Sequence, residues 1–238
     1  TVEAKGGWWG AGIGGAADEG GRIIISGGWV SAIGEGGGAG IGGGIGSDGG
    51  NITISGGTVN AVSKIGGAGI GGGLDGDGGN ITISGGRVNA VSESMGAGIG
   101  GGGWNGSGAE LKITGGVVFA DSSTGPMDVG AGLAYSNPDV PRVIPTEGSL
   151  EISADAALFL KHGTCPTPTT TTHTKESITG HAANSDAYGI SVAWGGNFDA
   201  YLRLCKLSYD LNGGSGDLPA AVTQHIGTVA SIAAGSEL

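Results

Sequence analysis

Apolar and polar residues alternate in short segments along the first two thirds of the chain, and the same segments return at a nearly constant interval. One of them occupies residues 23–26, 52–55, 81–84 and 111–114, with a less regular copy at 150–153. Alternation with a period of two is typical of β-strands that bury one face. The pattern therefore predicts strands and not helices in this part of the chain.

Two further segments complete each repeat. The string Gly-Ala-Gly-Ile/Leu begins at Gly10, Gly38, Gly67, Gly96 and Gly130, with spacings of 28, 29, 29 and 34 residues, and the third segment occupies 29–32, 58–61, 87–90 and 117–120. A unit of this size cannot bury its own apolar face, whereas stacked copies bury it against each other. The predicted fold class is all-β, a parallel β-helix of about five three-stranded turns. A right-handed helix is expected from the general preference of parallel crossovers.

The alternation also predicts which side chains face the interior. We expect Ile52 and Ile54 inside and Thr53 outside, because successive side chains of a strand point to opposite faces. One internal column is predicted to contain the apolar residue that follows each Gly-Ala-Gly, namely Ile13, Ile41, Ile70, Ile99 and Leu133. The glycine pairs at 27–28, 56–57, 85–86 and 115–116 are expected at corners that need a positive φ angle or a close backbone approach.

The chain divides into three regions by composition. Residues 1–160 hold the repeats of about 29 residues, 161–186 form a loop rich in threonine and proline, and 187–238 are expected to form a β cap with strands at 188–194 and 198–207. Residues 1–4 match the third segment of the repeat, so the chain is expected to begin inside a turn. It begins with Thr1 and not with methionine, and no signal segment follows, which suggests a processed chain.

The composition and net charge of the chain exclude some classes of binding partner. Glycine accounts for 58 of the 238 residues, and the net charge is −11 with only 10 lysines and arginines. A chain of this charge has no basic surface for a phosphate backbone, so nucleic acid is not expected as a partner. No apolar run is long enough for a membrane span.

Two parts of the sequence resemble known modules. Residues 207–219, Leu-Ser-Tyr-Asp-Leu-Asn-Gly-Gly-Ser-Gly-Asp-Leu-Pro, are similar to the opening of the Listeria–Bacteroides repeat, a β-grasp-like module of bacterial surface proteins. The Gly-Ala-Gly-Ile-Gly-Gly and Ile-Thr-Ile-Ser-Gly-Gly strings resemble the glycine-rich β-helical repeats of large secreted proteins of gut bacteria, often described as carbohydrate-binding. The resemblance implies an extracellular or cell-surface location in bacteria, within a multidomain chain.

Aromatic and acidic residues supply two candidate binding sites. Sugar rings stack on exposed aromatic faces. The candidates for carbohydrate binding are therefore Trp29 and Phe119 at outward strand positions and Trp9 and Trp104 in loops. The alternative interpretation is that these aromatic side chains pack against the β-helix or cap its ends. The loop at 74–80 has the oxygen density of a calcium site, and the candidate metal ligands are Asp48, Asp75 and Asp77. That loop matches neither an EF-hand nor the nine-residue calcium repeat, so solvated turns are the alternative. No cofactor is required for the predicted fold.

Two cysteines, one histidine and a glycine-rich motif are further candidates for a disulfide, a metal site and a nucleotide site. In an extracellular chain Cys165 and Cys205 are expected to form a disulfide, with two free thiols as the alternative. No zinc site is predicted at His162 and Cys165, because no two further ligands lie nearby in the sequence. The G-x-G-x-x-G string at 38–43 lacks the helix that a dinucleotide site needs, so its glycines are interpreted as corners.

The leading functional hypothesis is a non-catalytic β-solenoid module. No carboxylates line the outward strand positions, so no catalytic residues are assigned. The module would serve as an adhesin, a carbohydrate-binding platform or a stalk, with a polysaccharide or host glycan and the neighbouring domains of the same chain as partners. The alternatives are a polysaccharide hydrolase or lyase with its site near residues 134–149, and a purely structural spacer.

Overall fold

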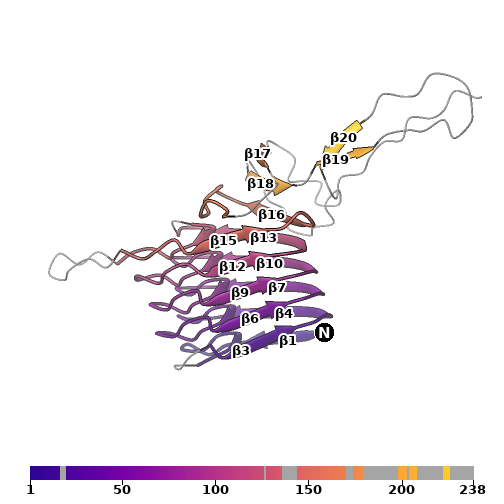
Figure 1. Ribbon diagram of the computed structural model, residues 1–238. Helices are drawn as coiled ribbons and strands as arrows, with labels where there is room; N and C mark the ends of the chain where they lie inside the picture. Colours follow the sequence, from indigo (N-terminus) through magenta and orange to yellow (C-terminus); the bar gives the residue numbers. More distant parts are fainter. Residues whose placement is uncertain are drawn as a thin grey trace, which may run out of the picture.

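The computed structural model describes residues 1–16, 20–125, 127–135, 144–169, 174–178, 198–202, 204–207 and 222–225. Within these ranges every regular element is a β-strand, which confirms the predicted all-β fold. The strands of successive repeats lie one above another as the rungs of a parallel β-helix (Figure 1).

The largest sheet has the strand order β1-β4-β7-β10-β13-β16-β18-β17. Its strands are β1 (Val2–Lys5), β4 (Trp29–Gly34), β7 (Thr58–Ser63), β10 (Arg87–Ser92), β13 (Gly116–Ser122), β16 (Ala156–Leu160), β18 (Phe198–Leu202) and β17 (Thr174–Ile178). The strands from β1 to β16 run parallel, whereas β18 pairs antiparallel with both β16 and β17. The C-terminal segment therefore extends the sheet and ends its parallel order.

Two five-stranded parallel sheets form the other walls of the β-helix. One contains β2 (Ile13–Gly14), β5 (Ile41–Gly42), β8 (Ile70–Gly71), β11 (Ile99–Gly100) and β14 (Val129–Gly130). The other contains β3 (Arg22–Ile25), β6 (Asn51–Ile54), β9 (Asn80–Ile83), β12 (Glu110–Ile113) and β15 (Ser149–Ile152). A separate antiparallel pair is formed by β19 (Leu204–Leu207) and β20 (Val222–His225).

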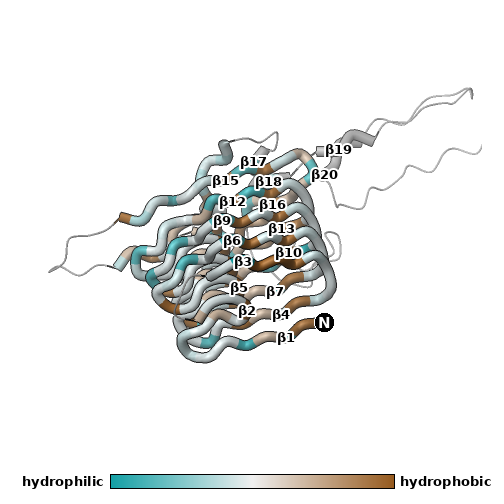
Figure 2. The backbone as a smooth tube through the Cα atoms, turned by 60° about the horizontal axis from the view of Figure 1, so that its bottom comes forward, coloured by the Kyte–Doolittle hydropathy of each residue, from teal (hydrophilic) through white to brown (hydrophobic). Residues whose placement is uncertain are grey.

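The constant repeat length places identical side chains on top of each other. Ile52 pairs with Ile81, and Val59 pairs with Val88. The inward side chains of these strands are at most 1% exposed. Hydrophobic residues accordingly follow one another from turn to turn along the β-helix (Figure 2). The predicted assignment of inner and outer faces is therefore confirmed for these strands.

One predicted column needs a correction. Leu133 is 43% exposed, and the partner of Ile99 in the next turn is Val129. The Gly-Ala-Gly-Leu string that begins at Gly130 looks like the start of a repeat, but Gly130 aligns with Gly100, so this string lies further along the turn. The apolar side chain that enters the core must precede a glycine of φ near 138°, and Val129 satisfies that requirement.

Glycine is required at two kinds of position. The second glycine of each corner pair has the positive φ that the sequence predicts, for example 82° at Gly28 and 89° at Gly57. Gly71 is constrained twice, because its φ is 134° and a Cβ there would lie 2.0 Å from the carbonyl oxygen of Gly100. The vertical distance between turns thus leaves no space for a side chain at this position.

Polar residues that stack inside the β-helix bind its own backbone. The hydroxyl groups of Ser63, Ser92 and Ser122 are buried and donate to glycine carbonyl oxygens 2.9–3.0 Å away. On the outer face, Asn89 Nδ2 donates to Asn60 Oδ1 at 2.7 Å. These three hydroxyls therefore have the partners that burial demands.

Part of the predicted C-terminal organisation falls within the described residues. The strand expected at 198–207 is present as β18 and β19. The strand expected at 188–194 and most of the segment 207–219 lie outside the described residues. No described segment forms a helix of the length and hydrophobicity that would cross a membrane.

The inner and outer positions of β9 provide a stability test. Replacing the fully buried Ile83 with aspartate should lower the free energy of unfolding by about 3–5 kcal/mol, because an unpaired charge would enter an apolar interior. Replacing its partly exposed neighbour Thr82 with aspartate should change stability far less. Urea unfolding followed by circular dichroism measures both, and equal losses would contradict the assignment of faces.

Candidate functional site

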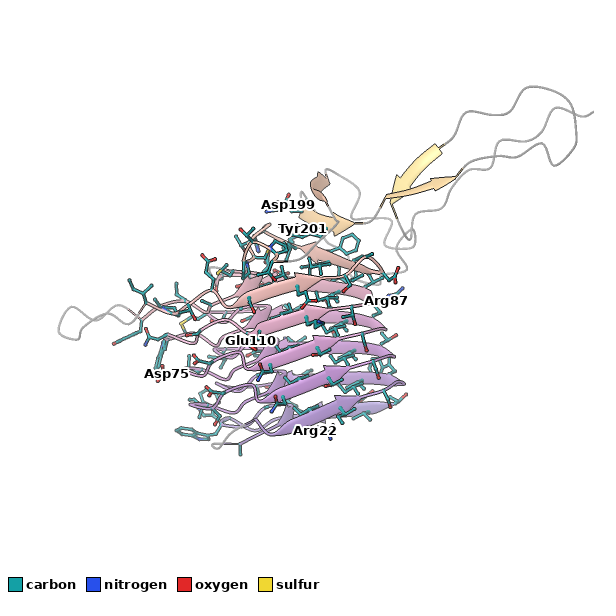
Figure 3. The ribbon with its side chains drawn as sticks, viewed as in Figure 1. Arg22, Asp75, Arg87, Glu110, Asp199 and Tyr201 are labelled. Atoms are coloured by element: carbon teal, nitrogen blue, oxygen red, sulfur yellow. The ribbon has the colours of Figure 1, made fainter. Side chains whose placement is uncertain are left out.

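A groove lies at the loop edge of the β-helix, where the chain leaves the sheet formed by β2, β5, β8, β11 and β14. It has a volume of about 280 Å³ and is lined by Trp9, Ile45, Gly46, Leu74, Asp75 and Trp104. Figure 3 shows Asp75 at the tips of these loops. The residues that follow β5, β8 and β11 come from equivalent loops, which stack as their strands do, whereas Trp9 comes from the loop before β2.

Backbone hydrogen bonds between turns hold the groove loops in place. The amide of Ile45 donates to the carbonyl oxygen of Trp9 at 2.9 Å, and the amide of Gly46 donates to that of Leu74 at 2.7 Å. The amide of Trp104 donates to the carbonyl oxygen of Leu133 at 2.7 Å. The groove is therefore built on ordered backbone, and its walls are fixed before any ligand arrives.

Two lining residues adopt an uncommon backbone conformation. Asp75 and Trp104 have φ angles of 67° and 68°, and Asn105, which follows Trp104, has a φ of 100°. These are the non-glycine residues with positive φ in the part of the chain that the structure describes. Such conformations cost about 1–3 kcal/mol each and concentrate at functional sites. Their presence at the groove marks this edge as different from the other loops.

The aromatic rings at the groove face solvent. Trp9 is 61% exposed and Trp104 is 44% exposed. The ring of Trp104 packs against the ring of Tyr135, with centroids 5.7 Å apart and planes inclined by 51°. This contact holds the Trp104 indole while leaving much of it available for a ligand.

The other two predicted aromatic residues do not join this groove. Trp29 is exposed at the start of β4 but lies in the column of Arg87, which Figure 3 shows near the edge opposite Asp75. The prediction for Phe119 is wrong, because the side chain is only 2% exposed. β16 places Phe159 beside it in register, and the two rings stack with centroids 4.5 Å apart.

The carboxylates of the three predicted calcium ligands do not converge on one point. Asp48 Oδ1 accepts a hydrogen bond from the amide of Asp77 at 2.8 Å, and Asp77 Oδ1 accepts one from the amide of Ser107 at 2.7 Å. Asp75 lines the groove instead. These three carboxylates therefore do not assemble into one site in the structure, and two of them satisfy backbone donors of the next turn. Calcium binding by these loops stays a prediction.

The structure describes only one of the two cysteines expected to form a disulfide, so their pairing is not tested. Cys165 Sγ lies 3.8 Å from the Tyr201 hydroxyl oxygen. Burial raises the pKa of the Cys165 thiol, so the group is protonated at neutral pH. The side chain of Cys205 lies outside the described residues.

A second cluster of polar side chains lies at the C-terminal end of the repeats. The ligand atoms of Asp121, Asp128 and His162 all lie within 4.8 Å of one another. Asp128 is fully buried, and its Oδ1 lies 3.0 Å from His162 Nδ1. The Asp121 carboxylate is mostly buried, and its Oδ1 accepts no hydrogen bond.

The surroundings of Asp121 favour its neutral form. Burial raises the pKa of this carboxyl above the usual 3.8, and the nearby charge of Asp128 raises it further, whereas His162 and Lys161 act in the opposite direction. Asp121 and Asp128 were not predicted as metal ligands, because they lie 34 or more residues before His162 in the sequence. A residue-by-residue alignment of the last turn with the earlier turns contains the signal, since both acids replace non-acidic residues.

Comparison with known families agrees with the fold. The sequence model of the Beta helix repeat family matches residues 1–17, 23–45, 52–74 and 81–103. These four segments fall on the stacked turns described above, so the match agrees with the parallel β-helix fold of this part of the chain. No curated protein and no solved structure shows significant similarity to the chain.

The raised pKa of Asp121 predicts how stability depends on pH. The folded protein holds the Asp121 proton more tightly than the unfolded chain, so this residue lowers the free energy of unfolding as the pH rises from about 3.8 through the folded-state pKa. Asp121→Asn should therefore unfold at a higher temperature than the original protein at pH 7 in metal-free buffer. The difference should shrink toward pH 3. Equal melting temperatures at pH 7 would contradict the assigned environment.

Proposed function

We propose that this β-helix is a non-catalytic carbohydrate-binding platform of a secreted or cell-surface bacterial protein, and that the groove between Trp9 and Trp104 receives the glycan. The observation that carries the proposal is the exposed indole at each end of one groove on a rigid repeat scaffold. Apolar faces of pyranose rings stack on aromatic side chains, and the ring hydroxyls need polar partners nearby. Asp75 supplies such a partner in the groove wall.

The dimensions of the repeat favour an extended ligand. Trp9 belongs to the first turn and Trp104 to the fourth, so three strand spacings, roughly 14 Å, separate their turns. A single sugar ring does not reach across that span, whereas a short oligosaccharide or a segment of a polysaccharide does. The platform is therefore expected to prefer chains of sugars over monosaccharides.

Charge favours a neutral glycan. The chain has a net charge of −11, and Asp75 is the one charged residue among the described residues that line the groove. An acidic polysaccharide would meet repulsion at this wall, and a neutral one would not. Binding of a neutral glycan releases few counterions, so the affinity for it should change little with salt concentration.

An open groove of this kind implies weak individual sites. Sites that bind small ligands tightly are concave and enclose most of the ligand surface. Repetition of weak sites along one polysaccharide or on neighbouring chains raises the overall affinity without new contacts. This role fits an adhesin or a stalk that also binds sugar, and a spacer without ligands is the outcome if no glycan binds.

Tryptophan substitutions test the proposal. Trp9→Ala and Trp104→Ala should each weaken binding of a neutral polysaccharide at least about tenfold, equivalent to about 1.4 kcal/mol. Trp8→Ala and Trp29→Ala are matched controls, because both side chains are exposed and neither lines the groove. A glycan array identifies the ligand, and isothermal titration at two salt concentrations measures the affinities.

Two results would contradict the platform. Absence of binding to every neutral glycan on the array would leave the structural spacer as the function. Equal losses in the groove variants and in the two controls would show that the indoles act through folding and not through contact.

A further inference from the structure

The last parallel turn departs from the repeat at two aligned positions. Asp121 pairs with Val91, and the same column holds Val62 and Ile33 in earlier turns. Asp128 precedes Val129, which pairs with Ile99, so Asp128 occupies the position of Gly98. The earlier turns have Gly12, Gly40 and Gly69 there. Two carboxylates thus appear together where the repeat has apolar residues and glycine.

Asp128 fits only because the stack of turns ends here. A Cβ at Gly98 would lie 2.7 Å from the amide nitrogen of Asp121, since the next turn passes directly over it. Beyond Asp128 the chain continues differently, and the segment after β16 brings His162 and Thr164 to this place. The buried position that excludes a side chain in earlier turns therefore accepts one in the last.

The carboxylate of Asp128 is held by three backbone amides. Its Oδ2 accepts hydrogen bonds from the amides of His162 at 2.6 Å and Thr164 at 3.4 Å, and its Oδ1 accepts one from the amide of Ser122 at 3.1 Å. These bonds fix the orientation of a fully buried group. They leave Oδ1 directed at the imidazole of His162.

One buried carboxylate oxygen of the cluster has no hydrogen-bond partner among the described residues, although His162 and Lys161 lie near it. Two carboxylates face one imidazole, and Asp121 Oδ1 is buried without a hydrogen bond, 3.9 Å from His162 Nδ1. Burying a carboxylate oxygen without a partner is costly. A bound cation would supply the partner that this oxygen lacks.

We propose that Asp121, Asp128 and His162 bind a divalent transition-metal ion, with Zn²⁺ as the best match. Three donors at about 2.0–2.2 Å from a tetrahedral zinc ion lie roughly 3.3–3.6 Å from one another. The two distances from His162 Nδ1, 3.0 Å and 3.9 Å, lie on either side of this range. One imidazole together with carboxylates suits Zn²⁺ better than Ca²⁺, which takes oxygen ligands.

The proposed site is open to solvent, and an ion bound there would stabilise the end of the β-helix. The His162 side chain is 47% exposed, so solvent reaches the cluster and water can complete the coordination. The ligands come from the end of β13, the loop before β14 and the segment after β16. An ion bound to all three would join the last turn to the chain that covers it, and binding would raise the stability of the folded state.

The experiment uses the full chain after removal of metals with a chelator. Zn²⁺ alone is titrated by calorimetry, and thermal unfolding is recorded with and without it. We expect one bound ion per chain and a higher melting temperature in its presence. Asp121→Asn and His162→Gln should each weaken zinc binding at least about tenfold. Glu93→Gln is the control, because Glu93 is an exposed carboxylate paired with Lys64 elsewhere on the β-helix.

Each variant is compared with its own metal-free form, so that a change in folding stability is not mistaken for loss of the ion. Retained binding in Glu93→Gln together with weakened binding in the two cluster variants supports the site. Absence of zinc binding overturns the proposal. Binding that is equal in all variants also overturns it, since the ion would then lie at the other histidines. Binding of Ca²⁺ as tight as that of Zn²⁺ would contradict the assigned metal class.

Discussion

Close vertical contact between successive turns is the constraint on which this structure depends. At Gly71 and at its equivalents Gly42 and Gly100, an added Cβ atom would lie only 2.0 Å from the carbonyl oxygen of the next turn. Glycine is therefore not a sign of disorder here, although it makes up 58 of 238 residues. It keeps the turns close enough for each to hydrogen-bond to the next, and the apolar columns form as a consequence of that register.

The same constraint decides where other residues can vary. Inside the stack, a change of side chain meets the turn above or below, so the inner positions repeat. Variation is tolerated at the loop tips, where Trp9, Leu74 and Trp104 form a groove, and at the end of the stack, where Asp128 finds space. The proposed glycan groove and the proposed metal site lie at these two kinds of place.

Much of the fold could be predicted from the sequence because one period governs it. Once Ile52 and Ile81 are aligned, the strands, their parallel order and the inward side chains follow from alternation and stacking. The prediction failed at Leu133, because two glycine-rich strings within one turn look alike and only the φ requirement at Gly130 distinguishes them.

The candidate sites depend on contacts that repetition does not reveal. Phe119 occupies an outward position, and its burial against Phe159 depends on β16, whose sequence departs from the repeat. His162 contacts Asp128 across 34 residues of chain, so their proximity appears only when the end of the stack is built. Sequence reasoning therefore identified the exposed indoles of the groove but not the acids that close the last turn.

The most direct test of the stacking constraint compares two glycines by thermal unfolding. Gly71→Ala combines a φ of 134° with a Cβ 2.0 Å from a backbone oxygen, whereas a Cβ at Gly27 meets no atom within 4 Å. We expect Gly71→Ala to lower the free energy of unfolding by about 3 kcal/mol or more. Gly27→Ala should leave it unchanged or raise it by up to about 1 kcal/mol, since alanine restricts the unfolded chain. If the two variants unfold at the same temperature, turn-to-turn contact through glycine does not hold this β-helix together.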